Sequence, residues 1–94
     1  MDNKYQVYII QSQSTDRYYC GYSGNVKQRL AAHNDPAYRL TRTTKVVSGP
    51  WQIVWTSEFL SRSEAVRLEK KIKKRGIGRF LSETESAESR RRRD

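Results

Sequence analysis

The chain has 94 residues, of which 35% are hydrophobic, and a formal net charge of +9. This length allows one small domain with a thin hydrophobic core. The single cysteine, Cys20, excludes an internal disulfide and a zinc site built from several cysteines. We expect a cytoplasmic protein with no membrane contact, since no apolar run reaches the length of a signal peptide or a membrane helix.

The first 22 residues predict a β-hairpin. Residues 4–10 and 17–22 are rich in β-branched and aromatic side chains, as strands are, and residues 12–16 supply a polar turn between them. Successive side chains of a strand point to opposite faces of the sheet. Tyr8 and Tyr19 can therefore meet across the hairpin on one face.

A helix and a third strand are expected next. Asn25 is a suitable N-cap for a helix that runs to about His33. Residues 38–42 fit either a short helix or an irregular basic loop. Residues 51–56 are again aromatic and β-branched, and predict a strand.

The last third predicts a capped helix and a tail. Ser61 and Glu64 have the spacing of a capping box, and the helix that they begin should end near Gly76. Residues 78–81 are expected to form a short turn that packs against the body. Residues 83–94 have no apolar anchor and are expected to form a disordered charged tail, which leaves residues 1–82 as the domain.

The predicted order of elements is β-β-α-(α)-β-α. This order indicates an α+β fold in which a small three-stranded antiparallel sheet is flanked by helices.

The positive charge belongs to the body of the chain. Residues 83–94 hold four acids and four arginines, so the excess lies in residues 1–82, with fifteen bases and six acids. Such a surface indicates a polyanionic partner, most simply nucleic acid, and the alternative is a solvated cationic surface with no specific partner. The bases expected to follow a nucleic-acid backbone are Arg39, Arg42, Lys45, Lys70, Lys71, Lys73, Lys74 and Arg75.

A few polar side chains suggest a catalytic site. Helical spacing puts Arg29 and His33 one turn apart on one face, and Glu69 borders the apolar stripe of the last predicted helix. Together with Tyr8 and Tyr19 in a basic domain, they suggest metal-assisted cleavage of a phosphodiester. Each residue also has a structural alternative: the tyrosines as ordinary strand aromatics, Arg29 and His33 as surface residues, and Glu69 as an i,i+4 partner of a lysine.

Five short motifs carry a family resemblance: Gln6-Val7-Tyr8, Tyr19-Cys20-Gly21, Arg29, His33-Asn34 and Ala65-Val66-Arg67-Leu68-Glu69. In this order and spacing they resemble the GIY-YIG nuclease superfamily. The likeness is greatest to the small single-domain YhbQ-like (UPF0213-type) predicted endonucleases, which are related to the nuclease module of the UvrC excinuclease subunit. It covers about residues 4–81.

The resemblance implies hydrolysis of a DNA phosphodiester with one divalent metal ion, Mg²⁺ or Mn²⁺. It assigns the metal to Glu69 and the phosphate contact to Arg29. It assigns the handling of the attacking water to Tyr8 and Tyr19, one of which would be the general base, with His33 as a helper.

The chain departs from the family pattern at three positions: Gln6 replaces a glycine, Cys20 occupies the centre of the second motif, and Tyr22 stands where UvrC-like enzymes have a lysine. Gly21 is retained, and is expected to keep side-chain bulk away from the site.

We therefore expect a metal-dependent DNA endonuclease that selects structure or strand rather than sequence, with a role in DNA repair or recombination by analogy. The alternatives are a non-catalytic nucleic-acid-binding module and a nuclease subunit that needs a protein partner.

Overall fold

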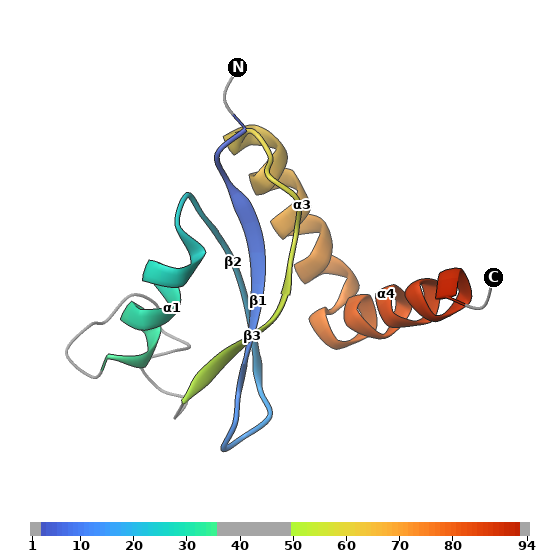
Figure 1. The fold of residues 1–94 in the computed structure, drawn as a ribbon, viewed down its shortest axis with the longest axis horizontal. Helices are drawn as coiled ribbons and strands as arrows, with labels where there is room; N and C mark the ends of the chain where they lie inside the picture. Colours follow the sequence, from blue (N-terminus) through green and yellow to red (C-terminus); the bar gives the residue numbers. More distant parts are fainter. Residues whose placement is uncertain (1–2, 36–49, 93–94) are drawn as a thin grey trace.

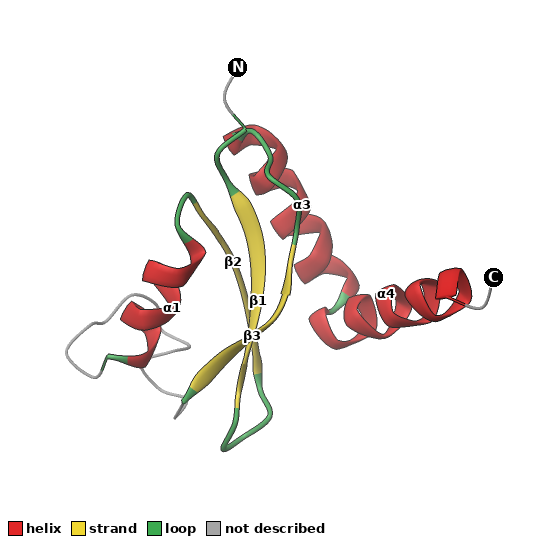
Figure 2. Cartoon of the chain, in the orientation of Figure 1, coloured by secondary structure: helices red, strands yellow, loops and turns green. Residues whose placement is uncertain are grey.

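The computed structural model describes residues 3–35 and 50–92, with side chains through Thr84. The elements in chain order are β1 (Gln6–Ser12), β2 (Tyr18–Ser23), α1 (Val26–Asn34), β3 (Trp51–Thr56), α3 (Arg62–Arg75) and α4 (Ile77–Arg92). The strands form an antiparallel sheet in the order β2-β1-β3, and helices lie on both sides of it (Figures 1 and 2). The predicted α+β class is confirmed. The alternatives for residues 38–42 lie outside the described residues.

The central strand β1 sets the register of the sheet. Tyr8 lies opposite Gly21 and Ile10 lies opposite Tyr19 in the pairing with β2. The strand begins later than predicted because Tyr5 does not continue the ladder: its backbone instead exchanges two hydrogen bonds with Leu60, at 3.0 and 2.7 Å.

Alternation along β1 divides the apolar residues between two clusters. Val7 and Ile9 pack with Cys20 and with residues of α3, whereas Tyr8 and Ile10 pack with residues of α1 and β3. All four β1 side chains are at most 2% exposed. The predicted placement of Tyr8 on the face opposite Val7 is therefore confirmed, and it turns this tyrosine toward α1.

Local sequence signals begin and end the helices as predicted. The Asn25 side chain accepts a hydrogen bond from the backbone of Gln28 at 3.1 Å and caps α1. The capping box of Ser61 and Glu64 is formed at the start of α3. This helix ends at Gly76, whose φ of 100° lies in the region that favours glycine.

The C-terminal segment differs from the prediction. Instead of a short turn over residues 78–81 and disorder from residue 83, the backbone is helical from Ile77 to Arg92. The prediction missed this helix because its polar second half has no periodic apolar stripe. A domain boundary at residue 82 stays a prediction.

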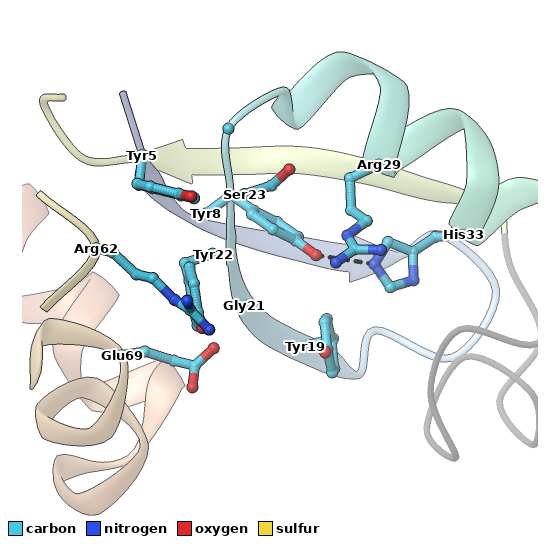
Figure 3. A pocket seen from close by; sticks show the side chains of 11 residues that line it. Tyr5, Tyr8, Tyr19, Gly21, Tyr22, Ser23, Arg29, His33, Arg62 and Glu69 are labelled. Atoms are coloured by element: carbon cyan, nitrogen blue, oxygen red, sulfur yellow. Dashed lines mark hydrogen bonds between the residues drawn. The ribbon is translucent and has the colours of Figure 1, made fainter. Parts of the chain in front are cut away.

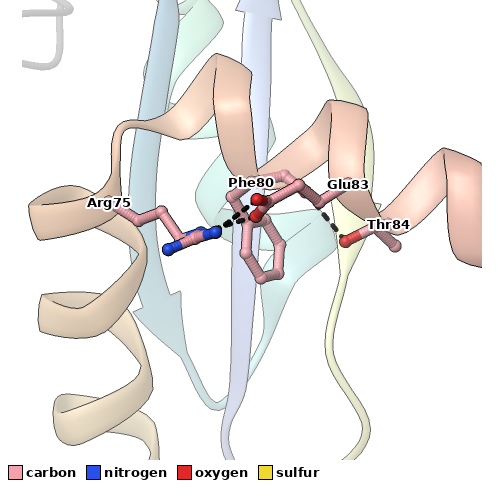
Figure 4. A network of polar contacts seen from close by, with 4 residues as sticks. All are labelled: Arg75, Phe80, Glu83 and Thr84. Carbon is pink, nitrogen blue, oxygen red and sulfur yellow. Dashed lines mark hydrogen bonds and ion pairs between the residues drawn. The ribbon is translucent and has the colours of Figure 1, made fainter.

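Contacts with the body hold the first turns of α4. The Phe80 ring packs edge-on against Trp55, with ring centroids 4.9 Å apart. Arg75, the last residue of α3, binds both carboxylate oxygens of Glu83, and the Thr84 hydroxyl donates to the Phe80 carbonyl (Figure 4). The contacts of Phe80 with Trp55 and of Arg75 with Glu83 join residues of separate elements, so spacing along one helix does not reveal them.

Candidate active site

The residues predicted to be catalytic line one pocket of about 360 Å³ (Figure 3). They come from four elements: Tyr8 from β1, Tyr19 from β2, Arg29 and His33 from α1, and Glu69 from α3. The other lining residues are Tyr5, Gly21, Tyr22, Ser23, Gly24 and Arg62. The fold thus brings together the whole set that the motifs suggested.

Tyr8 and His33 form a buried pair at the α1 side of the pocket. The Tyr8 hydroxyl and His33 Nε2 are 2.9 Å apart in a hydrogen bond, and the two side chains are 2% and 7% exposed. Burial and, secondly, the positive charge of Arg29 lower the pKa of His33 to about 4. Burial raises the pKa of Tyr8, and Tyr19 adds to this rise while Arg29 opposes it. At neutral pH the pair is therefore a neutral phenol and a neutral imidazole.

The other ring nitrogen of His33, Nδ1, is buried and makes no hydrogen bond to any residue that the structure describes. A buried nitrogen without a partner costs roughly 1–3 kcal/mol of stability. The pair with Tyr8 is thus the one described polar contact that fixes this ring.

Tyr19 packs against both members of the pair. Its ring centroid lies 6.3 Å from that of Tyr8 and 5.1 Å from that of His33. The approach depends on Gly21, because a Cβ atom built there would lie 2.8 Å from Tyr8 Oη and 3.1 Å from Tyr19 Cε2. The expectation that Gly21 keeps bulk away from the site agrees with this geometry.

Arg29 lies one helical turn before His33 and is exposed at the mouth of the pocket. Its guanidinium group points toward the Tyr8 hydroxyl and the His33 ring in Figure 3. This position explains why its charge lowers the pKa of both residues. An arginine here can bind a phosphate through two parallel hydrogen bonds.

Glu69 reaches the pocket from α3. Its side chain is 17% exposed, and Lys73 Nζ lies 3.5 Å from its Oε1 atom. The same ammonium group lies 5.9 Å from the centroid of the Tyr19 ring. The i,i+4 pairing that the sequence allowed is therefore formed, and it coexists with the position of Glu69 in the pocket.

The donor set at Glu69 fits a hard divalent cation. Mg²⁺ is commonly held by one or two carboxylates while it keeps several water molecules. Among the described residues no three His, Cys, Asp or Glu side chains gather into a metal-binding group, as a structural zinc site would require. A single, partly exposed carboxylate that faces a polar pocket is compatible with Mg²⁺ or Mn²⁺.

Five lining residues were missed by the sequence analysis, and three of them, Tyr5, Tyr22 and Arg62, have large side chains. Tyr5 and Tyr22 pack edge-on, with ring centroids 6.1 Å apart. Arg62 lies beside Tyr22 in Figure 3, and the interaction with the Tyr22 side chain raises the pKa of its guanidinium group. A signal for Arg62 was present, because it lies two helical turns before Glu69 and so on the same face of α3.

Asn34, which follows His33 in the fourth motif, has a structural contact. Its amide oxygen accepts from the Trp51 backbone at 2.6 Å, and its amide nitrogen donates to the Trp51 carbonyl at 3.0 Å. These two bonds join the end of α1 to the start of β3, and so help to hold His33 beside Tyr8.

The predicted nucleic-acid contacts are distributed along α3. Five of them, Lys70, Lys71, Lys73, Lys74 and Arg75, lie at the end of this helix and are exposed. Lys73 is paired with Glu69 and Arg75 with Glu83. Arg39, Arg42 and Lys45 lie outside the described residues. Binding by any of these residues stays a prediction.

A small basic α+β domain in which two tyrosines, an arginine, a histidine and a glutamate line one pocket has the features of a nuclease catalytic domain. The chain belongs to the GIY-YIG family, since the family model described as the GIY-YIG catalytic domain matches residues 4–76. The predicted family is therefore confirmed. Membership implies a nucleic-acid substrate.

The chain is also similar to three UPF0213 proteins. It is 37% identical to one from Staphylococcus haemolyticus over 71 residues, which cover 74% of this chain and 80% of that relative. It is 31% identical to one from Oceanobacillus iheyensis over 74 residues, or 78% and 80% of the two chains. It is 30% identical to one from Limosilactobacillus reuteri over 67 residues, or 70% and 67%.

No solved structure matches the chain. Over the part of the chain that the structure describes, no helix is both long and apolar enough to cross a membrane.

Proposed function

We propose that the protein is a metal-dependent DNA endonuclease that hydrolyses phosphodiester bonds in this pocket. The observation that carries the proposal is the convergence of a buried Tyr8–His33 pair with Arg29 and Glu69 in one pocket. These groups supply the three needs of the reaction: a proton acceptor, a cationic phosphate clamp and a metal ligand.

Arg29 holds the scissile phosphate. Its exposed guanidinium group can donate to two phosphate oxygens and offset the charge that develops on them during attack. The bound phosphate also neutralises the charge that lowers the pKa of His33. Substrate binding therefore makes His33 a stronger base at the moment when a base is needed.

The Tyr8–His33 pair accepts a proton from the attacking water. Burial raises the pKa of Tyr8, so a free phenolate is unfavourable at neutral pH. Tyr8 avoids this state by passing its own proton to His33 Nε2, 2.9 Å away, while it takes one from the water. The water oxygen forms the new bond to phosphorus, and the leaving oxygen departs with its bonding electron pair and is protonated from solvent.

Glu69 is the residue that would hold the metal ion. When bound, Mg²⁺ or Mn²⁺ polarises the scissile phosphate and stabilises charge on the leaving oxygen. Lys73 lies 3.5 Å from the same carboxylate and helps to orient it.

The substrate is selected by strand or structure rather than by a long base sequence. The exposed bases of α3 can contact phosphates, and phosphate contacts carry no sequence information. A role in DNA repair or recombination follows by analogy with the relatives of this fold.

The test compares the wild type with Glu69→Ala on single-stranded, duplex and branched DNA, in Mg²⁺, Mn²⁺ or EDTA. Glu58→Ala is the matched control, because Glu58 is exposed and does not line the pocket. We expect metal-dependent cutting by the wild type and Glu58→Ala only, with DNA binding retained by all three proteins. Salt-sensitive binding without cutting in any metal would instead indicate a non-catalytic binding module. Glu69-dependent cutting that appears only when cell extract is added would indicate a subunit that needs a partner.

A further inference from the structure

We propose that Arg62 forms a second phosphate-binding subsite in the pocket, for a phosphate next to the one that Arg29 holds. The inference rests on the proposed function, since it concerns the nucleic-acid strand bound at the same site.

The position of Arg62 is the first observation. Arg62 is the first residue of α3, and it lines the same pocket as Arg29 of α1. Figure 3 shows the two arginines on opposite sides of β2, with the Tyr8 and Tyr22 side chains between them. The two guanidinium groups can therefore contact different phosphates of a nucleic-acid strand that crosses the pocket.

The side chain of Arg62 has donors available for a ligand. Arg62 lies beside Tyr22 in Figure 3, and the Tyr22 ring packs edge-on against Tyr5, with ring centroids 6.1 Å apart. A guanidinium group has five N–H donors. Within the described residues Arg62 makes no ion pair, and Glu69 is paired with Lys73. An arginine in this state is suited to bind a planar or tetrahedral oxyanion.

The charge of the pocket supports the same conclusion. Its ionised lining residues are Arg29 and Arg62 against Glu69, and His33 is neutral at pH 7 because its pKa is about 4. One net positive charge remains, and a divalent cation on Glu69 would raise it further. A single phosphodiester carries one negative charge, so the loaded pocket can accommodate at least one more phosphate of the strand.

The test measures binding without cutting. The Kd of a fluorescein-labelled single-stranded DNA oligonucleotide is measured by anisotropy in EDTA, from 50 to 200 mM salt. The variants are Arg62→Ala and, as the matched control, Arg67→Ala, which removes an exposed arginine of the same helix that does not line the pocket. We expect Arg62→Ala to weaken binding roughly tenfold at low salt, as loss of a charge-assisted contact does. It should also reduce the slope of log K against log salt by about 0.7, the value for one phosphate contact.

A methylphosphonate scan locates the phosphate. The phosphodiester linkages of the oligonucleotide are replaced one at a time by neutral methylphosphonates. One replacement should weaken binding by the wild type and leave binding by Arg62→Ala unchanged. Replacement of the neighbouring linkage should weaken binding by the wild type and leave binding by Arg29→Ala unchanged. Tyr22→Phe keeps the guanidinium group and removes the hydroxyl of the neighbouring side chain, so its Kd should lie between those of the wild type and Arg62→Ala.

Two results would overturn the subsite: binding by Arg62→Ala that equals binding by Arg67→Ala at all salt concentrations, or a single linkage that accounts for both arginines. Either could occur while Glu69-dependent cutting is intact, and then only the subsite fails. Conversely, the expected Arg62 pattern in a protein that never cuts DNA would leave the subsite standing and reject the nuclease proposal.

Discussion

Gly21→Ala should disrupt the pocket from the sheet side. Gly21 faces Tyr8 in the β1–β2 register, and an added Cβ atom would lie 2.8 Å from Tyr8 Oη and 3.0 Å from Tyr8 Cζ. Cβ contacts below 3.0 Å are essentially never seen in proteins, so the Tyr8 ring has to move. Its hydroxyl is the group that holds His33 Nε2 at 2.9 Å, and moving it breaks that bond.

The expected loss has two parts. Overpacking a buried position costs about 1–3 kcal/mol, and leaving His33 without its described hydrogen bond costs roughly 1–3 kcal/mol. The two costs do not add fully, because moving the Tyr8 ring relieves the overpacking while it breaks the hydrogen bond to His33. We therefore expect a net loss of about 2–4 kcal/mol of unfolding free energy. For a domain of this size each kcal/mol corresponds to about 4–8 °C in Tm.

The assay is urea unfolding followed by tryptophan fluorescence, with Gly24→Ala as the control. The nearest atom to a Cβ at Gly24 is 3.9 Å away, and among the described glycines only Gly76 has a positive φ. Gly24→Ala should therefore be neutral or stabilising by up to about 1 kcal/mol. Adding Tyr8→Phe to Gly21→Ala removes the closest oxygen and should cost less than the sum of the two single changes. Equal unfolding midpoints for Gly21→Ala and Gly24→Ala would refute the close packing.

Three further predictions concern His33, Asn34 and Cys20. The pKa of His33 falls from its ordinary 6.5 to about 4 on folding, so the unfolded chain binds more protons between these values. Unfolding free energy should therefore decrease as the pH falls from 6.5 toward 4, by up to about 3 kcal/mol, and a His33→Gln variant with an unchanged pH slope in urea titrations would contradict this. Asn34→Ala removes both bonds to the Trp51 backbone and should lower unfolding free energy by about 1–3 kcal/mol. Asn34→Asp keeps the acceptor but sets a carboxylate oxygen against the Trp51 carbonyl, so it should also be destabilised, and unchanged unfolding midpoints for both variants would argue against the contact. Burial raises the pKa of Cys20 to about 12 and leaves the side chain 1% exposed, so a thiol reagent at pH 8 should react only after unfolding in urea, and rapid reaction of the native protein would show that the β2 packing is wrong.

Short-range sequence patterns correctly predicted the strands and helix ends that depend on residues close together in the chain. The alternation of Val7 and Tyr8 set the two faces of β1, and the spacing of Ser61 and Glu64 identified the start of α3. These signals operate within a few residues, where steric and hydrogen-bonding preferences already act in the unfolded chain. Motif order was enough to select the five candidate catalytic residues, all of which line the pocket.

Local patterns failed where the deciding contact joins distant segments. The helical state of residues 83–92 was missed, and the bond between Arg75 and Glu83 connects two helices across a glycine break. Tyr22 is adjacent to the second motif, yet nothing in its neighbourhood along the chain indicates a contact with Arg62.

The sequence by itself thus determined the fold class, because short-range periodicity predicts strands and helices. It also determined the family and the candidate catalytic residues, through the resemblance of its five motifs in their order and spacing. Only the tertiary structure decided that Tyr8 bonds to His33 across 25 positions of chain, that Gly21 has no room for a methyl group, and that Arg62 enters the pocket. Burial and electrostatic coupling depend on distances in space, and in this domain those distances are set by packing α1 and α3 on opposite faces of one three-stranded sheet.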